Sequence, residues 1–378
     1  MTIAVVCDIL GGGNNGTSIA AGGLIDAMRA RGHNVRVVCC DTDKMGKEGY
    51  YVLPARRFGP FDAFVKKTGV SLAKPEKRML KVALQGADVV HCMLPFALSA
   101  AAVRIAAKLG IPVTAGFHCQ AENFTNYIGL AVCAPLNDYV YYRFYRKVYA
   151  YAACVHYPSQ MIRMLFERKT SATRGEVISN GVENEIVPHK CSKPEYCKDA
   201  FVILSIGRYA REKRHGVLIR AAGKSKYKDK IQLIIAGEGA LEKRYRALSG
   251  KYGLRPPILG FMQRSELNAA LGYADLYVHP ADIELEGIAC LEAVKSGRTI
   301  VVSDSPKSAA GALVSDGRGL FKAGNADSLA RRIDYWIEHG EELESSDRYY
   351  ASCGKVRDRN ECMDDMEKMF LRAACLEK

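Results

Sequence analysis

The sequence predicts an α/β protein with two doubly wound, Rossmann-like domains that face each other across a cleft. Short apolar runs alternate with helical patterns along nearly the whole chain, which is typical of parallel sheets covered by helices. The alternation occurs twice, once on each side of an Asn-Gly turn in VISNGVENEIVP (177–188), where we place the hinge. We expect domains at 1–178 and 179–355, and a C-terminal helix at 356–378 that crosses back to the first domain.

Composition and charge restrict the class of protein. The apolar fraction of 48% and the charged fraction of 25% are typical of a globular protein. No apolar run approaches the roughly 20 residues of a membrane span, and the N-terminus lacks a basic leader, so we expect a cytoplasmic protein. The 13 cysteines are dispersed without metal-ligand spacing, which favours reduced thiols and no metal site. The net charge of +13 indicates a negative partner: nucleic acid, anionic lipid or a phosphorylated substrate.

The first domain opens with a strand, IAVVCD (3–8), and a glycine loop, GGGNNG (11–16). A helix from Thr17 or Ser18 to Arg31 follows, and Asp41 ends the next strand. Formally this is the dinucleotide-binding fingerprint, so an NAD(P)-dependent oxidoreductase is an alternative function. The other interpretation is a flexible backbone loop that lets a diphosphate approach from the second domain.

A basic segment with interleaved phenylalanines lies at 55–81. Basic residues mixed with exposed aromatic ones suit the headgroup layer of an anionic membrane. The alternative is a solvated helix face with the phenylalanines turned inward. The segment lacks the repeated basic helix or zinc spacing of a DNA reader, so we expect no nucleic-acid partner. The residues assigned to the membrane surface are Arg56, Arg57, Phe58, Phe61, Phe64, Lys66 and Lys67.

Two further strands, DVVHCMLP (88–95) and IPVTAGFHC (111–119), flank an alanine-rich helix. Because parallel strands place their carboxyl ends at one edge of a sheet, we expect His118 to face the cleft beside the glycine loop. The polar and aromatic segment QAENFTNYIG (120–129) suits an acceptor site, and its Glu122 is the carboxylate nearest to His118 in sequence. A structural histidine is the alternative.

A segment rich in tyrosine and arginine spans 139–169. Its tyrosines are candidates either for a membrane-interface belt or for packing between the domains. We expect packing for half of them.

The second domain repeats the alternation of strands and helices. Its predicted strands are FVILSIGR (201–208), IQLIIAGEG (231–239), PPILGF (256–261), LYV (276–278), RTIVVSD (298–304) and GLF (319–321). Its predicted helices begin at about His215 and at 241, 265, 288 and 326.

The stretch 276–297, LYVHPADIELEGIACLEAVKSG, predicts a phosphate-binding site. A strand that ends in a glycine turn and feeds a helix presents free N–H groups, and the helix dipole favours an anion there. Glu284 and Glu292 flank this position and could grip hydroxyls close to the phosphates. Arg208 and Lys213, at the end of another strand, would neutralise a departing diphosphate. An ordinary βα unit with an acidic loop is the alternative.

Taken together, these motifs resemble the retaining nucleotide-sugar glycosyltransferases of the GT-B fold, of the family 4 type. The resemblance rests on GRYAREK, AGEG, ILGF and the spacing of Glu284, Gly287 and Glu292. The wording ELEGIACLEA with FHCQAENFTNYIG is similar to a bacterial subgroup that glycosylates diacylglycerol or related lipids. One departure is Glu286, which stands where the family commonly has Phe and leaves the sugar preference open.

The resemblance implies a role for each matching residue. Arg208 and Lys213 would hold the donor pyrophosphate, and Glu292 the ribose hydroxyls. Backbone around Phe261 and Met262 would meet the base, and His118 would contact the sugar near the reacting carbon. The implied catalytic residues are His118, Arg208, Lys213 and Glu284. The implied donor-binding residues are Gly16, Met262, Glu284, Gly287, Ile288, Ala289 and Glu292.

The implied reaction moves a hexose from a nucleotide sugar, with uridine as the expected base, to a lipid acceptor such as diacylglycerol. An intermediate of capsule, cell-wall or lipopolysaccharide synthesis is the alternative acceptor. No carboxylate is a clear nucleophile, so we expect attack on the face from which the diphosphate leaves. We expect no cofactor and no metal, and a peripheral position on the inner face of the membrane.

Overall fold

The computed structural model describes residues 1–8, 10–11, 16–57, 59, 71–126, 129–130 and 133–376. The chain divides into two compact units: unit 1 is Met1–Asn180 with Asn360–Lys378, and unit 2 is Gly181–Arg359. The expected boundaries, after residues 178 and 355, lie close to these. The C-terminal helix belongs to unit 1.

Unit 1 is built on a seven-stranded sheet with the strand order β3-β2-β1-β4-β5-β6-β7, in which all neighbouring strands are parallel. Its strands are β1 (Thr2–Val6), β2 (Asn34–Cys39), β3 (Tyr50–Val52), β4 (Val89–Cys92), β5 (Val113–Gly116), β6 (Cys154–Tyr157) and β7 (Gly175–Val177). Its helices are α1 (Gly16–Ala30), α3 (Lys77–Leu84), α4 (Ala97–Leu109), α5 (Ala121–Asn126), α6 (Ala134–Lys147), α7 (Gln160–Lys169) and α14 (Arg359–Leu376).

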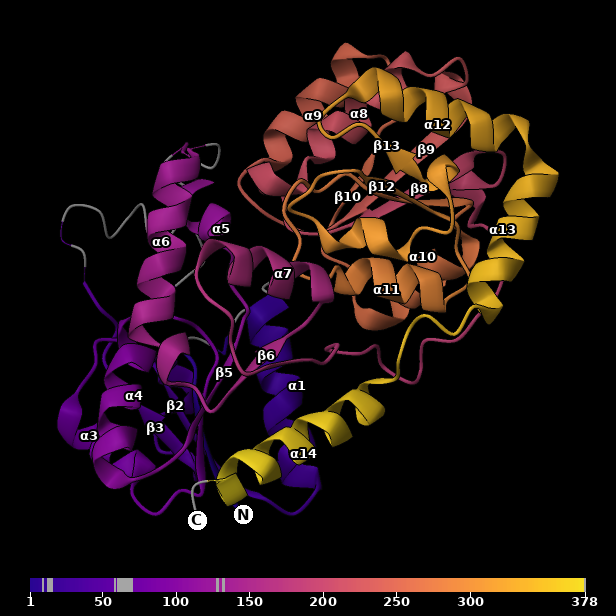
Figure 1. Ribbon diagram of the computed structural model, residues 1–378. Coiled ribbons are helices and arrows are strands. Elements are labelled where there is room, and N and C mark those ends of the chain that lie inside the picture. Colours follow the sequence, from indigo (N-terminus) through magenta and orange to yellow (C-terminus); the bar gives the residue numbers. More distant parts are fainter. Residues whose placement is uncertain are drawn as a thin grey trace. The chain divides into compact units, whose positions relative to one another are not determined.

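Helices cover both faces of this sheet, which is why strands such as β4 are buried along their whole length. Helices α1 and α14 lie on one side, where Met366 and Phe370 of α14 join a buried cluster with Ile3 and Val5 of β1. Helices α3, α4 and α6 lie on the opposite side (Figure 1). The last helix therefore completes the core of unit 1.

Unit 2 is built on a six-stranded parallel sheet with the order β10-β9-β8-β11-β12-β13. Its strands are β8 (Phe201–Ile206), β9 (Ile231–Ala236), β10 (Ile258–Gly260), β11 (Leu276–His279), β12 (Ile300–Ser303) and β13 (Leu320–Phe321). Its helices are α8 (His215–Lys224), α9 (Glu242–Lys251), α10 (Arg264–Tyr273), α11 (Ile288–Lys295), α12 (Ala326–Glu338) and α13 (Gly340–Ser352).

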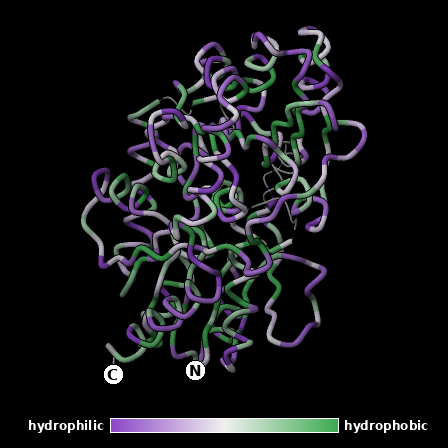
Figure 2. Tube along the Cα trace, turned by 90° about the vertical axis from the view of Figure 1, so that its right-hand side faces the viewer, coloured by the Kyte–Doolittle hydropathy of each residue, from purple (hydrophilic) through white to green (hydrophobic). Residues whose placement is uncertain are grey.

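Two apolar clusters, one on each face of the sheet, form the core of unit 2. Helices α8, α9 and α12 cover one face, and α10 and α11 cover the other (Figure 1). Along the Cα trace, hydrophobic segments run through the interior of each unit and hydrophilic ones lie mostly at its periphery (Figure 2). The doubly wound architecture expected from the alternation is confirmed in both units.

Several elements differ from the expectation. Helix α13 was not predicted, because its sequence GEELESSDRYYAS is mostly polar and its buried residues are Leu343, Asp347 and Tyr350. The first strand ends at Val6 instead of Asp8, and the Asp8 carboxylate accepts the N–H of Ala73 (2.9 Å).

The tyrosines of 139–169 divide between the surface and a core. Tyr141, Tyr149 and Tyr157 are buried, and they pack around Phe117 and Phe166. This packing lies inside unit 1, so the expectation of packing between domains is corrected for these three residues.

Candidate functional site

The strand order of unit 2 reverses at β8 and β11, which are neighbours in the sheet. In open parallel sheets, ligands bind outside the carboxyl ends of the strands at such a switch point. Arg208 and Lys213 follow β8, and the loop 282–287 follows β11. The topology thus brings two motifs that are far apart in the sequence to one position.

Glu284 is held at this position by two side chains. The Lys213 ammonium donates a hydrogen bond to Glu284 Oε2 (2.5 Å), and His279 Nε2 donates to the same oxygen (3.0 Å). Burial alone raises the pKa of the Glu284 carboxyl, but the charge of Lys213 and the bond from His279 outweigh it and lower the pKa to about 2. Glu284 is therefore a fixed carboxylate at neutral pH, suited to accept hydrogen bonds from hydroxyl groups.

The His279 ring is in turn oriented by a residue of the core, Tyr277. The Tyr277 hydroxyl lies 3.2 Å from His279 Nδ1, so it donates to that nitrogen when Nε2 carries the proton. Both residues are buried in β11. One chain of hydrogen bonds runs from the core to the loop through Tyr277, His279, Glu284 and Lys213, in this order.

Gly287 makes the turn into helix α11 possible. Its φ of 87° lies in the left-handed region, where a side chain is strained. A Cβ here would also meet Glu284 Cγ at 3.4 Å, so the carboxylate loop packs directly against the helix N-terminus. The first N–H groups of α11, from Ile288 and Ala289, have no carbonyl within the helix to bind.

The loops after β8 and β9 approach each other closely. A Cβ at Gly237 would lie 2.1 Å from the carbonyl oxygen of Gly207, so glycine is required there. In the first loop, Arg208 Nη2 lies 3.2 Å from Glu212 Oε1. The AGEG motif therefore allows the loop that carries Arg208 to pack on its neighbour.

Glu292, in the second turn of α11, forms an ion pair with Arg264 of α10 (Nη1 to Oε1, 2.7 Å). Arg264 also lies 3.1 Å from the carboxylate of Glu183. Burial raises the pKa of Glu292, although the charge of Arg264 opposes the shift. The carboxylate is thus buried and oriented by one guanidinium.

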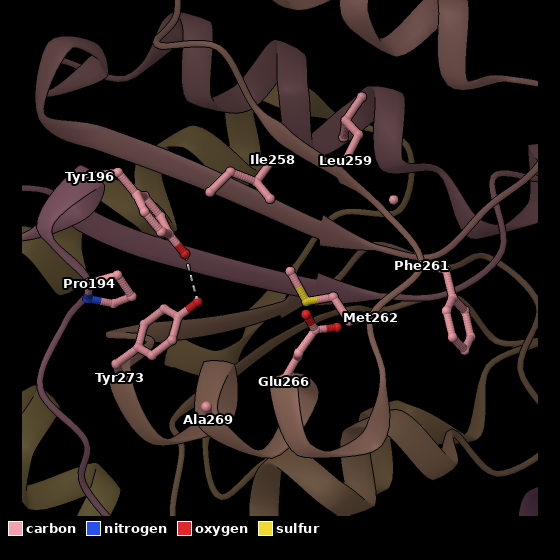
Figure 3. A pocket seen from close by; sticks show the side chains of 10 residues that line it. Pro194, Tyr196, Ile258, Leu259, Phe261, Met262, Glu266, Ala269 and Tyr273 are labelled. Carbon is pink, nitrogen blue, oxygen red and sulfur yellow. Dashed lines mark hydrogen bonds between the residues drawn. The ribbon is translucent and has the colours of Figure 1, made fainter.

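A pocket of about 430 Å³ lies between β10, α10 and residues 194–196 (Figure 3). Tyr196 and Tyr273 close one end through their hydroxyl groups (3.1 Å apart), and Met262 lies beside Glu266 toward the other. The volume and the apolar walls suit a small planar ligand group. Two of the lining residues, Met262 and Glu266, are each two residues away from Arg264 in the sequence.

The candidate residues of unit 1 are placed by β5 and α1. His118 follows β5, and its carbonyl accepts a hydrogen bond from the Thr17 hydroxyl in the first turn of α1 (3.3 Å). The ring is 7% exposed, packed against His156 at 5.4 Å, and burial lowers its pKa well below the usual value. His118 is therefore a neutral, enclosed imidazole and not an open one. Gly16 is the exposed first residue of α1.

Glu122 is also buried, and its Oε2 accepts a hydrogen bond from the Tyr141 hydroxyl (2.6 Å). This contact gives Glu122 a structural role in holding α5 against α6.

Asp41 bears on the alternative of a dinucleotide enzyme. Its carboxylate accepts the backbone N–H groups of Leu10 (2.7 Å) and Gly11 (3.0 Å). In the dinucleotide fold the corresponding acid binds a ribose hydroxyl. Here the Asp41 carboxylate is already bound by backbone N–H groups at the start of the glycine loop.

Of the residues expected at a membrane, Arg56 and Arg57 are exposed. The others, Phe58, Phe61, Phe64, Lys66 and Lys67, lie outside the described residues. Within the described part of the chain, no helix is both long and apolar enough to span a bilayer. The same residues contain no group of three histidine, cysteine or acidic side chains that could hold a metal ion.

Three residues of the site were not anticipated: Glu212, Arg264 and His279. His279 carried a signal, since it is a polar residue at the end of a buried strand, β11. Arg264 carried none, because its partners Glu183 and Glu292 are distant in the sequence.

Comparison with known proteins gives two family matches that together span most of the chain. Residues 14–185 match Glycosyltransferase Family 4, and residues 192–351 match Glycosyl transferases group 1. The two matches fall on unit 1 and unit 2.

Three of the proteins that this chain resembles are described here. The alpha-monoglucosyldiacylglycerol synthase of Streptococcus pneumoniae is 25% identical over 58% of this chain, and the match spans only 52% of that protein. The GDP-mannose-dependent alpha-mannosyltransferase of Mycolicibacterium smegmatis is 26% identical over 81% of this chain and 80% of its own. Among solved structures, Anabaena Alr3699/HepE in complex with UDP and glucose has a TM-score of 0.76 at 15% identity, covering 98% of this chain and 100% of its own.

Proposed function

Because the chain belongs to the glycosyltransferases of the GT-B fold and the family 4 type, we propose that it moves a hexose from a nucleotide sugar to a lipid acceptor. The proposed transfer retains the configuration at the sugar. The observation that carries the proposal is the ion pair of Lys213 and Glu284 at the switch point of unit 2, beside the N-terminus of α11, with Arg208 in the same loop as Lys213.

The charges suit a departing nucleoside diphosphate. When the bond between the sugar C1 and the phosphate oxygen breaks, the diphosphate gains negative charge, which Arg208, Lys213 and the α11 N–H groups would stabilise. Lys213 has three N–H donors, so it can bind Glu284 and a phosphate oxygen at once. The acceptor oxygen then bonds to C1 from the same face, and its proton passes to the departing phosphate. This scheme requires neither a metal nor a cofactor.

The remaining donor groups fit the carboxylates and the pocket. Glu284, ionised at neutral pH, would accept hydrogen bonds from the hexose hydroxyls. Glu292 would hold the ribose, and the pocket at Met262 would receive the base, for which we propose uracil. His118 and Gly16 of unit 1 would contact the sugar and the diphosphate.

The lipid acceptor is supported by the name of the Streptococcus pneumoniae relative, a glucosyldiacylglycerol synthase. We propose diacylglycerol or a related lipid, reached from the cytoplasmic face of the membrane. The exposed Arg56 and Arg57, with Phe58, Phe61, Phe64, Lys66 and Lys67, would contribute to membrane contact. An intermediate of capsule, cell-wall or lipopolysaccharide synthesis is the alternative acceptor.

A donor screen tests the proposal. Purified protein is incubated with several nucleotide sugars, with and without anionic vesicles that contain diacylglycerol, and released nucleoside diphosphate is measured. We expect consumption of a UDP-hexose and its loss in Lys213→Ala and Glu284→Ala. No consumption of any donor, or unchanged consumption in both variants, would exclude the function. An absorbance change at 340 nm with NADH or NADPH would instead favour the oxidoreductase.

A further inference from the structure

The outer face of helix α6 carries a stripe of exposed aromatic and basic side chains. We call this set the α6 stripe: Tyr139, Tyr142, Arg143, Arg146, Lys147 and Tyr151. The three tyrosines are 56%, 49% and 63% exposed. Tyr151 lies in the 3-10 turn Tyr149–Tyr151 that follows α6. On the helix, the pairs Tyr139 and Arg143, Tyr142 and Arg146, and Arg143 and Lys147 are each four residues apart, which places these five residues on one face.

The core of unit 1 does not need these side chains. The inner face of α6 buries Tyr141 and Phe144, and Tyr141 packs with Phe117 and Phe166. The helix is therefore anchored by its own apolar side. The three tyrosine rings of the stripe are exposed to solvent, and a group of exposed aromatic side chains indicates an interaction surface.

The charges of the stripe point to an anionic partner. Lys147 lies near Arg143 and near Arg104 of α4, and burial together with these two positive charges lowers its pKa. Within the described residues, none of the basic members of the stripe forms an ion pair, and Asp138 of the same helix is paired with Lys169 (2.7 Å). Gathering like charges is unfavourable in isolation, and a negative surface would offset the repulsion.

The two sides of unit 1 differ in charge. Helices α3 and α4, on the same side of the sheet as α6, add exposed basic residues and no acidic ones. These residues are Lys77, Arg78, Lys81, Arg104 and Lys108. Helix α14, on the opposite side, carries four acids and three basic residues, and its Asp364 is paired with Arg31 and its Asp365 with Lys368. An extended negative surface would therefore be attracted more strongly by the side that carries α3, α4 and α6.

The geometry of the rings favours a lipid surface over nucleic acid. The guanidinium of Arg143 lies over the ring of Tyr139 (5.8 Å), and that of Arg146 lies over Tyr142 (6.0 Å). Proteins that bind single strands stack bases on open aromatic faces, whereas these faces are partly covered. Tyrosine at a membrane interface needs only its ring edge and hydroxyl among the headgroups.

We propose that the α6 stripe, with Arg104, is the surface through which this protein docks onto an anionic lipid bilayer. The proposal rests on the proposed function, because a lipid acceptor has to be reached at a membrane surface. It adds a docking site on a helix outside the 56–67 segment.

Flotation with vesicles tests the docking surface. Vesicles of phosphatidylcholine and phosphatidylglycerol in equal amounts are compared with vesicles of phosphatidylcholine alone. A basic residue near an anionic surface contributes roughly fivefold to binding, so Arg143→Ser/Arg146→Ser/Lys147→Ser should bind the anionic vesicles about a hundredfold more weakly. Tyr139→Ser/Tyr142→Ser/Tyr151→Ser should also weaken binding, with less dependence on salt.

A matched control removes the same charge elsewhere. Lys230, Lys322 and Arg331 are exposed cations of unit 2, and Lys230→Ser/Lys322→Ser/Arg331→Ser should bind vesicles as the wild type does. Thermal unfolding and vesicle-free donor hydrolysis should be unchanged in all three variants.

Two results overturn the docking proposal. One is wild-type vesicle binding by both stripe variants, or an equal loss in the control. The other is loss of oligonucleotide binding in the stripe variants while vesicle binding stays intact. A wild-type protein that binds vesicles through the stripe but consumes no donor would instead refute the proposed function.

Discussion

The ammonium nitrogen of Lys213 lies 2.5 Å from the carboxylate oxygen Oε2 of Glu284, although the two residues follow different strands. Their side chains are 18% and 16% exposed, so water screens the pair only partly. Removing Glu284 leaves the Lys213 ammonium largely buried without this partner, and removing Lys213 leaves the Glu284 carboxylate with the hydrogen bond from His279. Either single removal is therefore more unfavourable than removing both.

The first prediction concerns this pair. Lys213→Ala should lower donor turnover about a hundredfold or more, since one electrostatic contact to the departing charge is lost. It should also lower the free energy of unfolding by about 3 kcal/mol. The double variant Lys213→Ala/Glu284→Ala should be more stable than the sum of the single losses, as measured by denaturant unfolding. Strictly additive losses would show that the pair is not coupled.

The second prediction concerns the stability of the protein at acidic pH. The folded pKa of Glu284, about 2, lies below its ordinary value of 4.5, so its contribution to stability is present above pH 4.5 and is lost as the pH falls toward 2. Lys213→Met should raise this pKa. The unfolding free energy should therefore fall less between pH 7 and pH 3 in Lys213→Met than in the wild type. Coinciding profiles would contradict the pairing.

The third prediction concerns Asp8, which should change the stability in the opposite direction when the pH falls. Burial raises its pKa to about 6, against hydrogen bonds from backbone groups that lower it. Between pH 6 and 4 the folded protein binds a proton that the unfolded chain does not, so this group makes the protein more stable as the pH falls through 6. In Asp8→Asn that increase should be absent. The test is the free energy of unfolding at pH 7.5 and at pH 5, with Asp26→Asn as the control.

The fourth prediction concerns Arg264 and Glu292. Arg264→Ala frees a buried carboxylate from the guanidinium that orients it, so the KM for the nucleotide sugar should rise about tenfold with a smaller change in kcat. Arg264→Lys should recover part of the loss. Arg246→Ala, which breaks the exposed pair with Glu242 (2.8 Å), serves as the control and should leave both constants unchanged.

The fifth prediction tests the pocket beside Met262. Ala269 lines it, and Ala269→Phe would fill part of its 430 Å³. If the base binds there, the affinity for UDP measured by calorimetry should fall at least tenfold, while Ala269→Ser has little effect. An unchanged affinity in a folded Ala269→Phe variant would place the base elsewhere.

Much of the fold followed from the sequence because each strand of a parallel sheet covered on both faces is a short apolar run. Strands such as Ile231–Ala236 are buried at every position, which leaves a clear signal. Helix α13 lacked such a signal, since it packs through only a few buried residues. The family matches confirm the resemblance read from GRYAREK and the glutamate spacing.

The sequence by itself determined the alternation of strands and helices, the glycine turn before α11 and the placement of Arg208, Lys213 and His118 at strand ends. Each of these features depends only on residues that are close together in the sequence. Only the tertiary structure decided that Glu284 meets Lys213 and His279, that Arg264 orients Glu292, and which tyrosines of α6 are buried. Such contacts depend on which strands are neighbours in the sheet and on which face of a helix packs, and both are set by the whole chain folding together.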